Sequence, residues 1–121
     1  MQTIEIQSFS YQERTQVLAS LSTALTQCGC WITDRRSVLP TQVEICFEAQ
    51  LSSAVELYTA ILGAGVELTR GAHLALTYLC MCRKHMRRRA EFGQVVELRL
   101  EISFLEDVTL HALLSSARAP S

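Results

Sequence analysis

Residues 96 to 104 alternate between apolar and polar side chains over five full periods. The apolar positions are Val96, Leu98, Leu100, Ile102 and Phe104. A period of two is typical of a β-strand with one face in the core and the other in water. The segment therefore predicts a sheet that is buried on one side only.

Three other segments have β character. Residues 3 to 8 alternate in the same way, residues 30 to 33 are β-formers after a glycine, and residues 43 to 49 alternate again. The last two are separated by a stretch with Pro40, which donates no hydrogen bond to a sheet. They are predicted to form a hairpin.

The remaining periodic segments indicate helices, at 11 to 28, 53 to 63, 70 to about 88, and a short one from Asp107. Ser10 and Ser53 each precede a glutamate by three residues, which is the spacing of a capping box. Thr69 is a candidate cap for the third helix, and Gly29 a candidate end for the first.

The predicted order resembles the split β-α-β of ferredoxin-like folds, with an extra helix before the last strand and a short C-terminal helix. The expected architecture is α+β: a four-stranded antiparallel sheet with helices on one face. ACT and related small-molecule-sensing domains share this topology, as do RNA-binding domains, so it implies no single activity. We expect a single domain over residues 1–121, with an ordered core at 1–114 and a frayed tail at 115–121.

The composition is typical of a folded globular domain. The 121 residues are 49% hydrophobic and 19% charged, which suits one ordinary core and argues against disorder. No secretory signal is visible and the cysteines are odd in number, five in all, so a cytoplasmic, reducing location is expected. The longest apolar run, 72 to 82, is shorter than the roughly 18 to 20 residues that cross a bilayer, so no membrane association is expected.

The solvent-exposed face of the predicted sheet is acidic. It gathers five carboxylates against Arg99, and these are Glu5, Glu44, Glu48, Glu97 and Glu101. An RNA-binding sheet needs stacking aromatics and positive charge, so we reject that function for this face. A cation or amine site, or a contact between two sheets, remains open beside a simply solvated face with cross-strand ion pairs.

Positive charge is concentrated in residues 83 to 89, which hold five of the eleven basic residues. A helix end favours some cations through its dipole, but not five. Together with the Asp34-Arg35-Arg36 cluster, the run suggests a tentative anion site, with candidates Arg35, Arg36, Arg83, Arg87 and Arg88. The alternatives are a solvated helix end and a charged guard on an edge strand.

The sulfur residues suggest a weaker site. Cys28, Cys30, Cys82 and His85 together offer four zinc-type ligands, and Cys82 and His85 could share one face of a helix. Only one residue separates Cys28 from Cys30, however, whereas strong zinc patterns have two or more residues between paired ligands. Buried thiols acting as small apolar side chains are the favoured interpretation. We expect Cys46 to be the most exposed thiol, with a thiolate disfavoured by neighbouring glutamates.

Signatures of catalysis are absent, including the nucleophile elbow, the phosphate loop and the dinucleotide fingerprint. His73 and His111 lie on largely apolar helices, where a satisfied imidazole is the favoured interpretation. We expect no cofactor, and the sequence does not decide whether the protein is an enzyme, although it leans against one.

The leading functional hypothesis is a noncatalytic ligand-sensing or protein-interaction domain that acts as a homodimer. The helix from residue 70 is apolar on most sides, so part of it should be buried by a second subunit. The dimer cleft would bind a small anionic metabolite near Trp31, Arg35 or Arg36, and the basic run at residues 83–89. The alternative is a nucleic acid or acidic partner bound through residues 83–89, with nucleic acid disfavoured by a net charge of −1.

Overall fold

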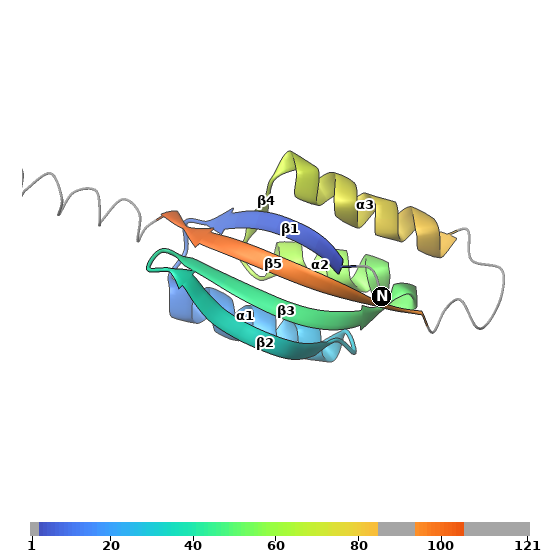
Figure 1. Cartoon of the computed structure of the whole chain (residues 1–121), viewed down its shortest axis with the longest axis horizontal. Helices are drawn as coiled ribbons and strands as arrows, with labels where there is room; N and C mark the ends of the chain where they lie inside the picture. Colours follow the sequence, from blue (N-terminus) through green and yellow to red (C-terminus); the bar gives the residue numbers. More distant parts are fainter. Residues whose placement is uncertain (1–2, 85–93, 106–121) are drawn as a thin grey trace, which may run out of the picture.

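The computed structural model describes residues 3–84 and 94–105 (Figure 1). Along the chain, the elements are β1 (Thr3–Ser10), α1 (Arg14–Gln27), β2 (Trp31–Leu39), β3 (Gln42–Gln50), a 3-10 turn η1 (Leu51–Ser53), α2 (Ala54–Gly63), β4 (Glu67–Leu68), α3 (Arg70–Lys84) and β5 (Val95–Phe104). The predicted mixture of helices and strands is confirmed. The continuation of α3 to residue 88, the helix from Asp107 and the tail at 115–121 lie outside the described residues.

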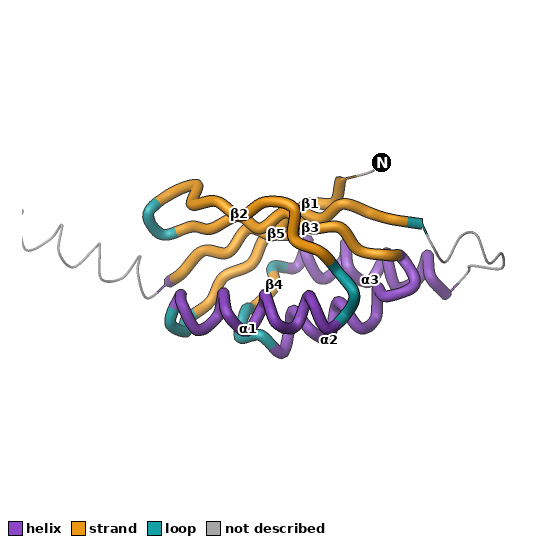
Figure 2. Tube along the Cα trace, turned by 90° about the horizontal axis from the view of Figure 1, so that it is seen from below, coloured by secondary structure: helices purple, strands orange, loops and turns teal. Residues whose placement is uncertain are grey.

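The five strands form one sheet in the order β2-β3-β5-β1-β4, and the three helices lie on one side of it (Figure 2). The alternation of β5 matches this layering, because its apolar side chains are buried while Glu97, Arg99 and Glu101 are only partly covered. In β3, Ile45 and Phe47 are fully buried in the same core. β5 is therefore buried on one side as predicted, whereas in β3 Glu44 and Cys46, on the face away from the helices, are buried as well.

The predicted four-stranded antiparallel sheet is wrong. β5 is antiparallel to β3 but parallel to β1, and β4 adds a fifth strand that is antiparallel to β1. The sheet is mixed, and the ferredoxin-like arrangement is not confirmed.

The third helix explains the difference. β3 ends at Gln50, opposite Val95 at the start of β5, so the chain must return to the same end of the sheet before β5 begins. α2 carries it away to β4, which pairs with the end of β1, and α3 carries it back (Figure 1). A single helix would deliver the last strand parallel to β3. Because α3 reverses the path, β5 is antiparallel to β3 and lies beside β1 with the same direction.

The helix starts were predicted with mixed success. α1 begins at Arg14, and Ser10 does not cap it: the Ser10 hydroxyl accepts from the Gln12 amide at 3.1 Å and donates to the Gly65 carbonyl at 2.7 Å. Thr69 does cap α3, since its hydroxyl accepts the Ala72 amide at 3.2 Å. Ser53 is the N-cap residue of α2 but makes no capping hydrogen bond through its side chain.

The end of α1 was predicted correctly. Gly29 follows the helix with φ of 81°, a left-handed conformation in which glycine carries no steric penalty. Among the described helices, none is both long and apolar enough to span a bilayer.

Candidate functional site

Strand β2 forms one outer edge of the sheet (Figure 1). Its ladder runs to β3 on one side, and every one of its nine residues is exposed. The exposed residues include large apolar side chains at both ends of the strand, among them Trp31 at 44% and Leu39 at 55%. An edge of this length presents backbone donors and acceptors that another chain can pair with.

An arginine-rich cleft of about 210 Å³ opens between β2 and the start of α1. Its lining combines three cations, one hydroxyl and two apolar side chains, from Arg14, Arg35, Arg36, Ser37, Leu18 and Val43. We call this group the arginine cleft. Guanidinium groups bind carboxylates and phosphates through paired N–H donors, so the arginine cleft has the chemistry of an oxyanion site.

Arg14 is held in place from three directions. Its guanidinium donates to the Pro40 carbonyl at 2.8 Å and to the Ser37 hydroxyl at 3.3 Å. The guanidinium carbon also lies 5.5 Å from the centre of the buried Phe104 ring. A side chain fixed in this way loses little conformational entropy when it binds a ligand.

Arg35 and Arg36 both border the arginine cleft, but their side chains lie on opposite faces of β2. Arg35 stands opposite Ile45 on the helix side, whereas Arg36 stands opposite Glu44 and pairs with it at 2.9 Å. Across residues 3–84 and 94–105, no carboxylate lies within ion-pair distance of the Arg35 guanidinium. Arg35 is therefore the cation most available to a ligand.

The open face of the sheet carries an ion-pair network centred on Glu44. One carboxylate oxygen of Glu44 lies 2.9 Å from Arg36 and 3.4 Å from the Arg99 Nε, and Arg99 also donates to Glu5 at 3.1 Å. The carboxylate of Glu44 is almost wholly buried, and the hydrogen bond from Arg36 holds its pKa below the ordinary value. The arginines neutralise this part of the acidic face from within the chain.

Cys46 lies beneath the same network, and the prediction of an exposed thiol is wrong. It is 8% exposed, in register with Arg99 on one side and Asp34 on the other. Burial raises the pKa of the Cys46 thiol, and the Glu44 charge adds to this effect. The thiol is therefore a poor nucleophile, as expected from its glutamate neighbours.

The predicted acidic residues occupy three rows across the open face. Glu44 and Glu101 are directly opposite, as are Glu48 and Glu97, while Glu5 is opposite Arg99. The strand register thus places the five glutamates on one face of the sheet. In the described part of the chain, no group of three or more histidine, cysteine or acidic side chains is arranged to hold a metal ion.

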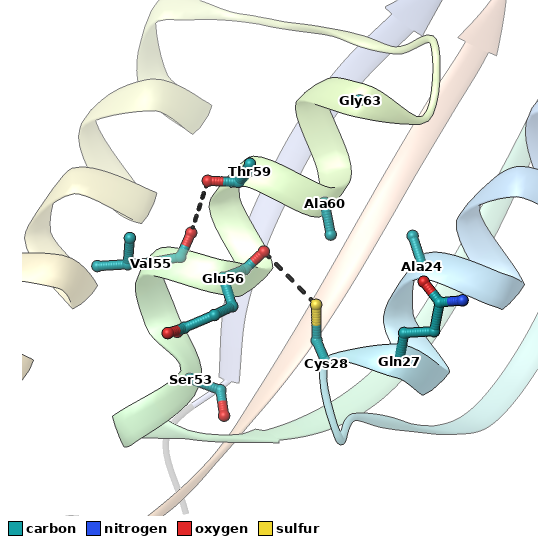
Figure 3. A pocket seen from close by; sticks show the side chains of 9 residues that line it. All are labelled: Ala24, Gln27, Cys28, Ser53, Val55, Glu56, Thr59, Ala60 and Gly63. Carbon is teal, nitrogen blue, oxygen red and sulfur yellow. Dashed lines mark hydrogen bonds between the residues drawn. The ribbon is translucent and has the colours of Figure 1, made fainter.

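A second hollow of about 740 Å³ runs between the end of α1 and the outer side of α2 (Figure 3). The Cys28 thiol points across it and donates to the Glu56 carbonyl at 3.5 Å. Burial and the Glu56 charge raise the pKa of Cys28, so this thiol is not activated. Apart from Glu56, the hollow offers small or neutral side chains and has little means to select a ligand.

The proposed zinc ligands are not assembled by the described residues. Cys30 is buried, and its pKa is raised to about 11, chiefly by burial, which matches a thiol acting as an apolar side chain. Cys28 lies at the C-terminal end of α1 and Cys82 in the last turn of α3. His85 lies outside the described residues.

Helix α3 keeps apolar surface uncovered, as the sequence predicted. Leu74, Tyr78 and Met81 follow each other at helical spacing and are all more than half exposed, while Leu76 and Leu79 face the core. We call the three exposed residues the α3 stripe. On the same helix, His73 is half-buried and hydrogen-bonded to the Tyr58 hydroxyl, which confirms a satisfied imidazole there.

The basic candidates at the end of α3 are separated from the arginine cleft. Arg83 lies in the last turn of α3, whereas Arg87, Arg88 and His111 lie outside the described residues. α3 packs against β1 and β4, at the sheet edge opposite β2 (Figure 1). Within one chain, Arg83 and Arg35 therefore do not share a site.

Sequence reasoning missed Arg14 as a site residue. It is the first residue of α1, within a segment predicted to be helical, and no motif links it to β2. The hydrogen bond to Pro40, 26 residues away, depends on how α1 packs under the hairpin. No local signal would have found it.

Comparison of the chain with protein-family models, with curated proteins and with solved structures finds no match.

Proposed function

We propose that this protein is a noncatalytic ligand-sensing module that acts as a homodimer and binds a small oxyanion, a phosphate or a carboxylate, in the arginine cleft. The observation that carries the proposal is the convergence of Arg14, from α1, and Arg35, from β2, on one cleft that Arg36 also borders. Its volume of about 210 Å³ suits a small anion better than a nucleotide or a peptide.

The charges in the arginine cleft support a small oxyanion as the ligand. Arg36 is engaged by Glu44, whereas no carboxylate of the described residues lies within ion-pair distance of Arg35. Hydrogen bonds to Pro40 and Ser37 hold Arg14 beside it. An anion that enters would gain charge-assisted hydrogen bonds, and Ser37 could donate one more. The raised thiol pKa values described above support a binding role over nucleophilic catalysis.

Thermal unfolding with added anions tests the proposal. Phosphate, sulfate, citrate and acidic amino acids are compared with chloride at equal ionic strength. An anion at a hundredfold over its dissociation constant stabilises by about 2.7 kcal/mol, which is several degrees for a domain of this size.

Two variants make the test specific. Arg35→Ala should abolish the shift, whereas Arg70→Ala, which removes another exposed cation at the start of α3, should keep it. Equal responses in both variants would show general charge screening and overturn the oxyanion site. No shift with any of the anions would also overturn it.

A second candidate function rests on α3. The helix contains no acidic residue, exposes the α3 stripe and leads into the basic run at 83–89. An apolar stripe beside positive charge is suited to an acidic protein segment. Nucleic acid is the weaker partner here because the net charge of the chain is −1.

Salt dependence and a substitution in the α3 stripe distinguish an acidic peptide from a nucleic acid as the partner of α3. Tyr78→Ala should weaken binding of an acidic amphipathic peptide. A duplex held through phosphates should lose affinity steeply as salt rises and be insensitive to Tyr78→Ala.

A further inference from the structure

The two outer strands of the sheet differ in how open they are. β4 has two residues, whereas β2 has nine, all exposed. A short edge strand offers little for another chain to pair with, and a long one offers a full ladder. Among the described strands, β2 is therefore the edge on which a second chain could extend the sheet.

The residues of β2 are complementary to a reversed copy of the same strand. With the two Arg35 residues opposite each other, the antiparallel pairs are Trp31 with Leu39, Ile32 with Val38, Thr33 with Ser37, and Asp34 with Arg36. Apolar residues meet apolar residues at both ends, hydroxyls meet hydroxyls, and a carboxylate meets a guanidinium.

Residues that would pair across the two β2 strands also lie on the same face of the sheet. Asp34 and Arg36 stand opposite Cys46 and Glu44 of β3, so both belong to the open face and would meet on it. Trp31 and Leu39 also share that face, through their positions opposite Glu48 and Gln42. A two-fold axis through Arg35, perpendicular to the sheet, would place the helices of both copies on the same side.

Three features of β2 oppose spontaneous pairing. The amide of Arg35 donates to the Asp34 carboxylate at 2.9 Å, so the chain partly covers its own edge. The strand also has irregular register on either side of its centre, between Ile32 and Asp34 and between Ser37 and Leu39. In addition, the pair at the axis would bring two Arg35 cations together, and like charges directly opposite are unfavourable.

The arginine cleft offers a way to neutralise the two Arg35 cations at the axis. Arg35 lies at the axis and lines the cleft, so the two clefts of a pair would adjoin there, each with its own Arg14. An oxyanion between them would neutralise the two Arg35 cations. We propose that two copies join through antiparallel β2 strands centred on Arg35, and that an oxyanion in the adjoining arginine clefts promotes this pairing. The anion dependence rests on the function proposed above, whereas the β2 register does not.

α3 is a poorer surface for a second copy. Two α3 helices packed in opposite directions through the α3 stripe would place Arg70 beside the cations at residues 83 and 84 of the other copy. The helix has no acidic residue to offset this repulsion. The β2 edge, with Asp34 facing Arg36, has the better charge match.

Disulfide cross-linking tests the register. Arg35→Cys places a thiol at the axis and removes the repulsion, so it should give a covalent dimer under mild oxidation. Ser37→Cys, two residues along the same strand, is the matched control and should remain monomeric on a nonreducing gel, as should the wild type with its native cysteines. Cross-linking of Ser37→Cys alone, or of neither variant, would overturn the register.

Sedimentation velocity in phosphate and in chloride, at equal ionic strength, tests the dependence on anion. The wild type should dimerise more strongly in phosphate. Arg35→Thr, without the cation at the axis, should dimerise about twofold to fivefold more tightly than the wild type in chloride and gain nothing from phosphate.

The outcomes separate the two proposals. Equal dimerisation in both buffers would overturn the anion dependence and leave the β2 register standing. A phosphate-dependent rise in melting temperature without dimerisation would support the oxyanion site and overturn pairing through β2. A monomer in both buffers with no phosphate shift would overturn both.

Discussion

Replacing Leu76 with alanine should destabilise the protein far more than the same replacement at Leu74. The two leucines lie on α3 within one turn of each other, but Leu76 is 1% exposed and Leu74 is 62% exposed. Truncating a fully buried leucine costs about 2–5 kcal/mol, because the transfer free energy is lost and a cavity remains. An exposed substitution changes the free energy of unfolding by about 0.5 kcal/mol or less.

Urea unfolding followed by circular dichroism measures both variants, and thermal melts give a second reading. Leu76→Ala should lower the melting temperature by about 8–20 °C, with Leu74→Ala close to the wild type. A similar loss in both would refute the packing of α3 through Leu76. If the loss at Leu74 grew with protein concentration, the α3 stripe would be covered by a second copy, and the β2 edge would no longer be the preferred interface.

Two other changes have definite expectations. Arg36 holds the pKa of Glu44 below its value in the unfolded chain. The ion pair therefore stabilises the fold above about pH 4.5, and this stability is lost as the pH falls through the lower pKa of the folded state. Glu44→Gln should flatten this part of the curve of unfolding free energy against pH, measured by urea unfolding. Parallel curves for Glu44→Gln and the wild type would contradict it. Gly65→Ala and Gly29→Ala should each cost roughly 1–2 kcal/mol, because both glycines have positive φ, and the Cβ added at Gly65 would meet only the end of the exposed Gln12 side chain, which can move aside. A much lower melting temperature for Gly65→Ala than for Gly29→Ala would show that Gln12 is held in place.

Much of the local structure could be predicted because it follows from short-range rules. Alternation in residues 96 to 104 identified the buried face of β5, Thr69 identified the start of α3, and Gly29 the end of α1. The capping prediction at Ser10 was wrong because Ser10 is still the last residue of β1, and α1 begins only at Arg14, with Glu13 as its N-cap. The two-residue strand β4 was missed because a segment so short carries no periodicity.

Only part of the candidate site could be predicted from the sequence. Arg35 and Arg36 were identified because charged residues on an adjacent pair of β positions stand out in the sequence. Arg14 was not, since its role depends on α1 packing under the hairpin so that it reaches Pro40 and Ser37. The exposure of Cys46 was also predicted wrongly, because it depends on the burial of the neighbouring Glu44 beneath Arg36 and Arg99 on strands β2 and β5.

The sequence by itself determined which side of β1, β3 and β5 is apolar, and hence that the sheet has one core face and one polar face. Period and chirality act over a few residues, so these features need no knowledge of distant partners. Only the tertiary structure decided the order and direction of the strands. That outcome depends on α3 returning the chain to the start of β5, which no residue pattern within α3 encodes. The same long-range path places β2 at an open edge and brings Arg14 to it, so the proposed site exists only in the folded chain.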